Sequence, residues 1–357
     1  MPRPPRDTHD GPRVLAWPGL GARTKNPYTW LLYSQLASLG VRVEEFTVAR
    51  ALRGGYDVFH VHWPDKALTA GPWVVSAAGA AAALACLDAA HRHGARVVWT
   101  AHNAHPHESR HPRLERWFWG AFVRRVDAVV HPSVAGQEAV EARYPALAAR
   151  PHAVVPLGHY RGSYPDAVSR EEARASLDIP PGTRVMTYFG LLRPYKNVPQ
   201  LIRTAGELFA RTGDVTLLVV GAPLTSTIAE EVRAAAGGDP RVRLVLEHVP
   251  EIDVQRYLRA ADLVVLPFRE ITNSGSALLA LSFDRPVLVP SRGAMGELQA
   301  IAGHDWVRTY EGDLTPQILA TALDWATHRV PDASPRLDAL EWPEIARQTL
   351  ALYLAPS

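Results

Sequence analysis

Two segments in the C-terminal half of the chain combine positive charge with open backbone. The first, residues 190–197 (GLLRPYKN), follows an apolar run and places Arg193 and Lys196 three residues apart. Gly190 allows a close backbone turn, and a helix start offers free N–H groups to an anion. Arginine adds a fork of donors and lysine a point charge. This pattern predicts a diphosphate site, and the alternative is an ordinary basic helix start.

The second segment, residues 268–290, opens with a polar loop after another apolar run. The loop residues are Thr272, Asn273, Ser274, Gly275 and Ser276. Gly275 leaves backbone amides open to a phosphate at the start of the next helix. A simple helix cap by Ser274 or Ser276 is the alternative, and it is compatible with phosphate binding.

Histidines gather behind two expected strands of the N-terminal half, in the segments FHVHWPD (59–65) and TAHNAHPHE (100–108). The side chains expected to converge are His62, His102, His105, His107, Asp65 and Glu108. A histidine or carboxylate there could take a proton from a substrate hydroxyl or orient a substrate. We expect His60 to alternate into the sheet, and His91 and His93 to be solvated. His60 with His62, and His102 with His107, also have a spacing seen in metal sites.

A glycine-containing loop follows the first expected strand, in residues 17–30 (WPGLGARTKNPYTW). Gly19 and Gly21 alone are a weak signal. Arg23 and Lys25 add positive charge and could hold an acceptor phosphate. The alternative is a flexible polar loop.

Aromatic residues and arginines alternate in residues 108–125 (ESRHPRLERWFWGAFVRR). A helix lying on an anionic lipid surface has this composition. So does a helix that packs its aromatic side chains on a sheet and leaves its arginines in water. Both interpretations stay open at this stage.

Short apolar runs that alternate with helical patterns must position these residues. Strands are expected at 14–17, 41–46, 58–62, 96–101, 128–131 and 153–156, and again at 184–190, 215–221, 242–246, 262–267, 286–290 and 306–309. Helices are expected at 27–39, 73–93, 112–125 and 135–143, and then at 198–212, 225–236, 251–261, 276–283, 295–302, 316–328 and 337–354. This alternation favours parallel sheets, whose ligands bind beyond the carboxyl ends of the strands.

Composition fits two domains. The 357 residues are 47% hydrophobic, enough for two cores. Residues 157–182 are rich in glycine and proline, and the boundary is placed there. We expect a disordered tail at 1–12, an N-terminal domain at 13–165, a C-terminal domain at 166–335, and a helix in 336–357 that returns to the first domain.

The distribution of charge and the number of cysteines limit the partners and the cellular compartment that the chain could have. Residues 1–165 carry 19 Lys and Arg against 12 Asp and Glu, whereas the remainder carries 19 against 24. The basic half could attract an anionic acceptor or a membrane surface, or the bias could be compositional chance. No nucleic-acid motif is present. The single cysteine, Cys86, suits a reducing compartment. With no signal segment or long apolar run expected, we predict a cytoplasmic protein that could lie peripherally on the inner membrane face.

The C-terminal half resembles the donor-binding domain of GT-B glycosyltransferases, close to the GT4-like group. The markers are GLLRPYKN, VTLLVVGAP, the NSGSA loop and DRPVLVPSRGAMGEL, and the resemblance covers roughly residues 13–330. It implies an α/β fold of two Rossmann-like, doubly wound domains facing across a cleft. It also implies transfer of a hexose from a GDP-, UDP- or dTDP-sugar to a hydroxyl of a glycan, glycolipid or natural product.

The resemblance assigns roles residue by residue. Arg193 and Lys196 match the basic pair on the donor pyrophosphate, and Asn273–Ser276 match the loop that holds the distal phosphate. His248 and Val249 match the segment that holds the base. His102 matches a histidine near the transferred sugar, with His62 and Glu108 as further catalytic candidates. The Gly19–Lys25 loop would face the phosphates and the acceptor. Metal-free catalysis without a cofactor is implied, because cations and helix dipoles neutralise the leaving diphosphate.

One departure from the family pattern concerns two glutamates. GT4-like enzymes often carry a pair across the phosphate-loop helix. Here the second position falls at Leu278 or Leu279, and Glu270 could replace the first with its register shifted by about one residue. Two rivals remain: a sugar-nucleotide epimerase of the same fold and, because of the missing glutamate, a non-catalytic sugar-nucleotide binding protein.

Overall fold

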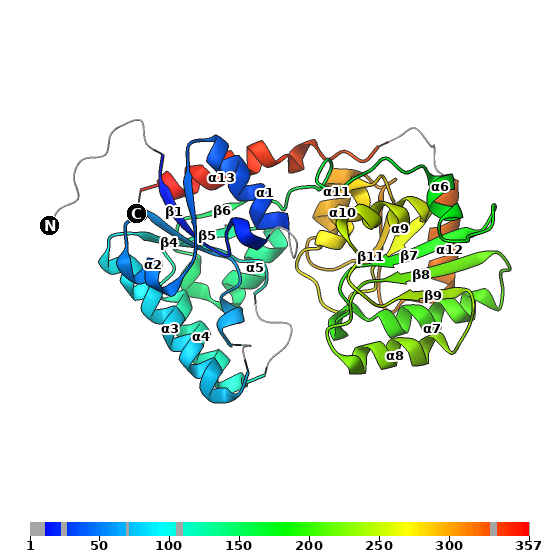
Figure 1. Cartoon of the computed structure of the whole chain (residues 1–357), viewed down its shortest axis with the longest axis horizontal. Coiled ribbons are helices and arrows are strands. Elements are labelled where there is room, and N and C mark those ends of the chain that lie inside the picture. The colour runs from blue at the N-terminus through cyan, green and yellow to red at the C-terminus, as the bar shows by residue number, and fades with distance from the viewer. Residues whose placement is uncertain (1–10, 23–26, 69–70, 105–109, 329–333, 357) are drawn as a thin grey trace. The chain divides into compact units, whose positions relative to one another are not determined.

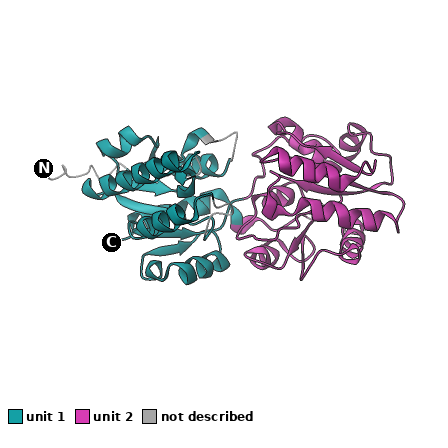
Figure 2. Ribbon diagram, turned by 90° about the horizontal axis from the view of Figure 1, so that it is seen from below, with its two compact units in different colours: residues 1–158, 340–357 teal, residues 159–339 magenta. Residues whose placement is uncertain are grey.

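The computed structural model describes residues 11–22, 27–68, 71–104, 110–328 and 334–356. The chain divides into two compact units, and each is treated by itself (Figure 2). The first comprises residues 1–158 and 340–357, and the second residues 159–339. The tail expected at 1–12 lies almost wholly outside the described residues.

The first unit is built on a parallel six-stranded sheet in the order β2-β1-β3-β4-β5-β6. The strands are β1 (Arg13–Trp17), β2 (Arg42–Glu45), β3 (Val58–Val61), β4 (Arg96–Thr100), β5 (Ala128–His131) and β6 (His152–Val154). The helices are α1 (Pro27–Ser38), α2 (Val48–Arg53), α3 (Trp73–Arg92), α4 (Pro112–Val123), α5 (Val134–Arg143) and α13 (Trp342–Leu354).

Both faces of the first sheet are covered, so the side chains of its central strands β3 and β4 are buried on both sides. On one face, alternate residues such as Phe59, Val61 and Trp99 pack on α3 and α4. On the other, Val58 and Val98 share a core with α1 and α13 (Figure 1). The side chain of His60 alternates with Phe59 and Val61, so it points toward α1 and α13.

The second unit repeats this architecture with the sheet order β12-β11-β10-β7-β8-β9. Its strands are β7 (Arg184–Phe189), β8 (Val215–Val220), β9 (Val242–Val245), β10 (Leu263–Val265), β11 (Val287–Pro290) and β12 (Val307–Tyr310). Its helices are α6 (Arg170–Ala175), α7 (Val198–Phe209), α8 (Ser226–Ala236), α9 (Val254–Ala260), α10 (Gly275–Ser282), α11 (Met295–Ala302) and α12 (Pro316–Thr327). Within it α7 packs between α8 and α12, and α6 packs on α9.

The boundary between the units falls at 158/159 rather than at 165/166. The reason is that residues just after Gly158 bond to the second unit. The Tyr160 amide donates to Ser282 Oγ at 2.8 Å, and Arg161 pairs with Asp284 at 2.9 Å. The second unit also extends to Ala339, so residues 336–339 belong to it and not to the returning segment.

Helix α3 has the length and the apolar composition of a membrane-crossing helix, although no such helix was expected. Of its most apolar stretch, 44% is buried inside the structure, where Ala80, Leu84 and Leu87 join the core. A core helix of a globular protein can have the same length and composition, so α3 is only weak evidence for a membrane-crossing segment.

Candidate active site

Glycines bring the loops after β7 and β8 into close contact at the carboxyl edge of the second sheet. Gly221 has a φ of +146°, and a Cβ there would lie 2.0 Å from the carbonyl oxygen of Gly190. Gly190 has a φ of +138°. A Cβ on it would lie 2.6 Å from Ser276 Oγ and 3.4 Å from Lys196 Nζ. The ammonium and the hydroxyl therefore approach the same point beside Gly190, which only glycine leaves open.

Lys196 supplies a positive charge that no carboxylate among the described residues neutralises. It ends a short 3₁₀ turn (Pro194–Lys196), and its ammonium lies 5.5 Å from the ring centre of Phe268. Burial, and then the neighbouring charge of Arg193, lowers the pKa of Lys196 to about 8. A partly buried cation in this state gains free energy when an anion arrives.

The start of α10 offers hydrogen-bond donors at the same place. Ser274 caps the helix, because its hydroxyl accepts from the Ala277 amide at 3.1 Å. In the described part of the chain, the amides of Gly275 and Ser276 have no hydrogen-bond partner. The buried Nδ2 of Asn273 likewise has none. These donors and the helix dipole suit a phosphate.

Two residues that sequence reasoning did not single out shape this loop from the segment just after β11. Arg292 donates to the Arg269 carbonyl at 2.7 Å. Gly293 has a φ of +53°, and a Cβ there would lie 2.2 Å from the Ile271 carbonyl oxygen. A glycine after a strand was the available signal, since the segment SRGAMGEL had been noted as a family marker.

In the first unit, a chain of buried aromatic and imidazole groups leads to His102. Tyr33 OH lies 2.8 Å from His62 Nε2, and His62 Nδ1 lies 3.1 Å from His102 Nε2. The partly buried His102 ring stacks on Trp63, with centroids 4.4 Å apart. The edge of Tyr28 meets the same ring at 5.0 Å.

Burial keeps His60, His62 and His102 uncharged. It lowers the pKa of His102 to about 3, with a smaller effect from Lys66. It also lowers the pKa of His60 to about 3 and that of His62 well below its usual range. At neutral pH these rings are therefore neutral hydrogen-bonding groups.

The glycine loop of the first unit binds a carboxylate of its own chain. The amides of Gly19 and Gly21 donate to Glu45 Oε1 and Oε2, each at 2.9 Å. A phosphate could use these two amides only if Glu45 left them.

Comparison with known proteins assigns the chain to a family. The family model described as "Glycosyl transferases group 1" matches residues 183–326. The GDP-mannose:glycolipid 4-beta-D-mannosyltransferase of Xanthomonas campestris is 32% identical over 329 residues, which is 92% of this chain and 88% of that protein. The chain belongs to the group 1 glycosyltransferases.

Solved structures agree with the GT-B fold of this glycosyltransferase. Sucrose-phosphate synthase from Thermosynechococcus elongatus has a TM-score of 0.65 at 17% identity and covers 96% of both chains. The trehalose-6-phosphate protein of E. coli bound with UDP-2-fluoro glucose has a TM-score of 0.68 at 10% identity and covers 96% of this chain and 99% of that one. The expected fold class and the expected activity, hexosyl transfer from a nucleotide sugar, are confirmed.

The remaining predicted residues of the glycosyltransferase fall into two groups. His248 follows β9 and is exposed, Val249 packs partly against the core, and Glu270 is exposed in the loop after β10. Asp65 lies in the 3₁₀ turn Pro64–Leu68 and is partly buried. Outside the described residues lie Arg23, Lys25, His105, His107 and Glu108. Within the described ranges, no group of three or more His, Cys, Asp or Glu side chains could hold a metal ion.

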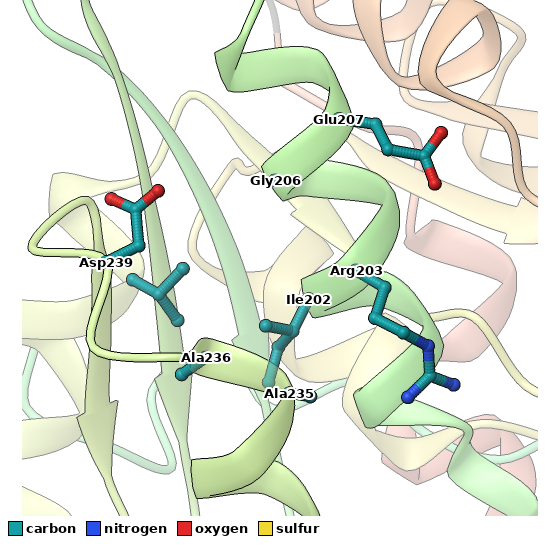
Figure 3. Close-up of a pocket in the computed structure, with 8 residues that line it drawn as sticks. Ile202, Arg203, Gly206, Glu207, Ala235, Ala236 and Asp239 are labelled. Carbon is teal, nitrogen blue, oxygen red and sulfur yellow. The ribbon is translucent and has the colours of Figure 1, made fainter.

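A pocket of about 430 Å³ lies away from these loops, between α7 and α8 (Figure 3). Its lining includes Arg203, Glu207 and Asp239, near the C-terminal ends of both helices and the start of β9. This is the amino edge of the sheet, whereas ligands of such sheets bind at the carboxyl edge. We therefore assign it no part in transfer.

Proposed function

We propose that this glycosyltransferase transfers mannose from GDP-mannose to a hydroxyl of a glycolipid. The observation that carries the proposal is the Lys196 ammonium beside Gly190 and the open start of α10, a site suited to the donor's diphosphate. The choice of guanine nucleotide, mannose and glycolipid is supported by the Xanthomonas mannosyltransferase, which matches nearly the whole chain.

Charge stabilisation would carry the chemistry. As the sugar leaves, negative charge grows on the diphosphate, and donors already in place lower that barrier. Lys196, Arg193 and the amides of Gly275 and Ser276 would supply them, without a metal or cofactor. His248 and Val249 would hold the base, Asn273 a phosphate oxygen, and Glu270 the donor sugar. The acceptor would lie on the first unit near His62 and His102.

Thermal-shift measurements with GDP, UDP, dTDP and ADP test the donor site. A nucleotide at 100 times its dissociation constant adds about 2.7 kcal/mol to the free energy of unfolding. We expect the largest shift with GDP, and its loss in Lys196→Ala. Arg203→Ala is the matched control. It removes a cation from α7, which follows Lys196 in the sequence, but on the side of the pocket at the amino edge of the sheet. A larger shift with UDP, or a full GDP shift in Lys196→Ala, would refute the donor assignment.

Turnover separates the two remaining alternatives. A transferase releases GDP from GDP-mannose faster when a glycolipid acceptor is added. An epimerase releases nucleotide at a rate independent of acceptor, and a binding protein releases none.

We also propose that the first unit contacts an anionic membrane through an α3–α4 surface. This surface consists of Trp73, Val74 and Val75 from α3 and Arg113, Arg116 and Trp117 from α4. Trp73, Val74 and Trp117 are 59%, 70% and 54% exposed. The two helices begin side by side, since His111 Nε2 lies 3.3 Å from the Gly71 carbonyl oxygen. Phe118, Trp119 and Phe122 are buried, so one side of α4 packs in the core while its other side forms part of this surface.

Vesicle sedimentation tests the membrane contact. We expect binding to phosphatidylglycerol vesicles and little to phosphatidylcholine, since exposed aromatics insert at the interface and arginines pair with anionic lipid. Trp73→Ser with Trp117→Ser, and separately Arg113→Glu with Arg116→Glu, should each weaken binding about tenfold or more. Ile252→Ser, at a 58% exposed apolar residue of the second unit, is the control. Equal binding by all variants would rule out this surface.

A further inference from the structure

The hydrogen-bonded chain behind His102 begins on a helix from the far end of the sequence. Tyr353 OH, on α13, lies 2.6 Å from His60 Nδ1, although 293 positions separate them. The Tyr33 hydroxyl also approaches His60 Nδ1, at 3.0 Å, and it approaches His62 Nε2 at 2.8 Å. Thr100 Oγ1 lies 2.7 Å from His60 Nε2 and closes the inner end.

Each ring in this chain carries one hydrogen. Burial disfavours the charged form of all three histidines, as described above, and it also raises the pKa of Tyr33 and Tyr353. A neutral imidazole has one N–H donor and one acceptor nitrogen. Fixing the hydrogen at one end of such a chain therefore fixes every hydrogen along it.

The short Tyr353–His60 contact decides where the hydrogens lie. An oxygen and a nitrogen 2.6 Å apart must have a hydrogen between them. When Tyr353 donates, the lone pair of His60 Nδ1 already accepts that hydrogen. When His60 Nδ1 donates, it carries a hydrogen and has no lone pair for a second donor. In both cases Tyr33 cannot donate to His60.

Among the groups that the structure describes, the remaining acceptor for the Tyr33 hydroxyl hydrogen is His62 Nε2. Tyr33 is fully buried, and a buried hydroxyl hydrogen without an acceptor is costly. His62 must then carry its hydrogen on Nδ1 and donate it to His102 Nε2. His102 Nε2 is left as an acceptor, so its hydrogen is on Nδ1. No described residue accepts from His102 Nδ1.

We infer that Tyr353, acting through His60, Tyr33 and His62, holds His102 in the Nδ1–H form, so that His102 donates a hydrogen bond to an oxygen of the substrate. The substrate contact rests on the proposed function. In this form His102 has no free lone pair at Nδ1 and does not take the proton of the acceptor hydroxyl. Tyr353, His60, Tyr33 and His62 are positioning residues.

The chain is not a route for net proton transfer. Its inner end is Thr100, which is fully buried, as is His60. A proton passed inward from His102 would stop in the core, where a charged group is costly. The base for the acceptor hydroxyl must therefore be another group.

Nitrogen-15 NMR of histidine-labelled full-length protein reads the tautomer directly. The His102 signals are identified by their loss in His102→Asn. We expect a protonated Nδ1 and an unprotonated Nε2 in the wild type. In Tyr353→Phe the His60 lone pair is free for Tyr33, and a population protonated on Nε2 should appear at His102.

Tyr56→Phe is the matched control, because Tyr56 is a buried tyrosine of the same unit that donates to the Ala51 carbonyl at 2.8 Å. It should leave the His102 tautomer unchanged. Tyr33→Phe breaks the chain one step later and provides a second variant in case Tyr353→Phe does not fold. A wild-type His102 protonated on Nε2, or a tautomer that ignores Tyr353 and Tyr33, would overturn the inference.

Turnover then tests the substrate contact. His102→Asn keeps an N–H donor near the position of Nδ1, whereas His102→Asp offers only acceptors. Loss of one hydrogen bond should make kcat about tenfold lower in the Asp variant than in the Asn variant. A more active Asp variant would make His102 a base and overturn the donor role. The GDP thermal shift is read separately and does not depend on His102.

Discussion

In the proposed donor site, the charge of Lys196 should make nucleotide binding depend on pH. Its pKa is lowered to about 8, so it loses its proton as the pH rises through 8. A diphosphate binds the protonated form better, so affinity for GDP should fall above pH 8, by up to tenfold per pH unit. Calorimetric titration of GDP between pH 7 and 9.5 measures this.

Lys196→Arg is the control for this prediction, because arginine stays charged throughout this range. Titration of the nucleotide acts on both proteins, so the difference between them isolates Lys196. In the absence of nucleotide, the effect of Lys196 on the free energy of unfolding has the opposite dependence on pH. The unfolded chain binds more protons than the folded one between pH 8 and 10.5, so Lys196 makes stability rise with pH there. A parallel fall of affinity in both proteins would contradict the assignment.

At the residue scale, the sequence predicted contacts between loops that follow strands, but not contacts between residues far apart along the chain. That Lys196, Ser276 and Gly190 lie close together could be predicted, because each follows a strand and loops after parallel strands meet at one edge. The partners of Glu45 and His60 could not. Glu45 is a strand-end residue without a motif, and Tyr353 reaches His60 only through the packing of α13.

At the scale of elements, α13 meets the first unit through a glycine. A Cβ on Gly158 would lie 2.3 Å from the indole of Trp342, the first residue of α13. Gly158→Ala should therefore push Trp342 out of the core and lower the free energy of unfolding by about 1–3 kcal/mol. Urea denaturation followed by tryptophan fluorescence measures the loss.

Gly120→Ala provides a comparison of opposite sign within the same unit. Gly120 lies inside α4, and the atom nearest to an added Cβ is Arg124 Nη1 at 3.8 Å. Alanine should gain about 0.5–1 kcal/mol there, because glycine is a poor helix former. Equal effects of the two substitutions would show that Trp342 does not pack on Gly158 as described.

Most helices and strands were predictable, but the short helix α2 was not. The apolar periodicity gave the bounds of α1, α7 and α12 closely at their starts, and strands such as β8 stood out as unbroken apolar runs. The six-residue helix α2 was not expected, since it is too short to show a helical period. Its cap, Thr47 accepting from the Arg50 amide, was the signal available.

At the scale of the whole molecule, alternating strands and helices were enough to predict two doubly wound units. The boundary was placed seven residues late because glycine and proline mark a linker region but not the residue where contacts change sides. Hydrogen bonds of Tyr160 and Arg161 decide that, and they join segments more than 100 positions apart.

The first unit is discontinuous, and this sets an order on its synthesis. Residues 340–357 leave the ribosome only after all of residues 159–339. The second unit is a single stretch, so it has everything it needs to fold during translation. The first must wait with its α1 face uncovered and its imidazole chain missing the Tyr353 hydroxyl. A nascent chain that stopped near residue 339 would thus hold a complete second unit and an unfinished first unit.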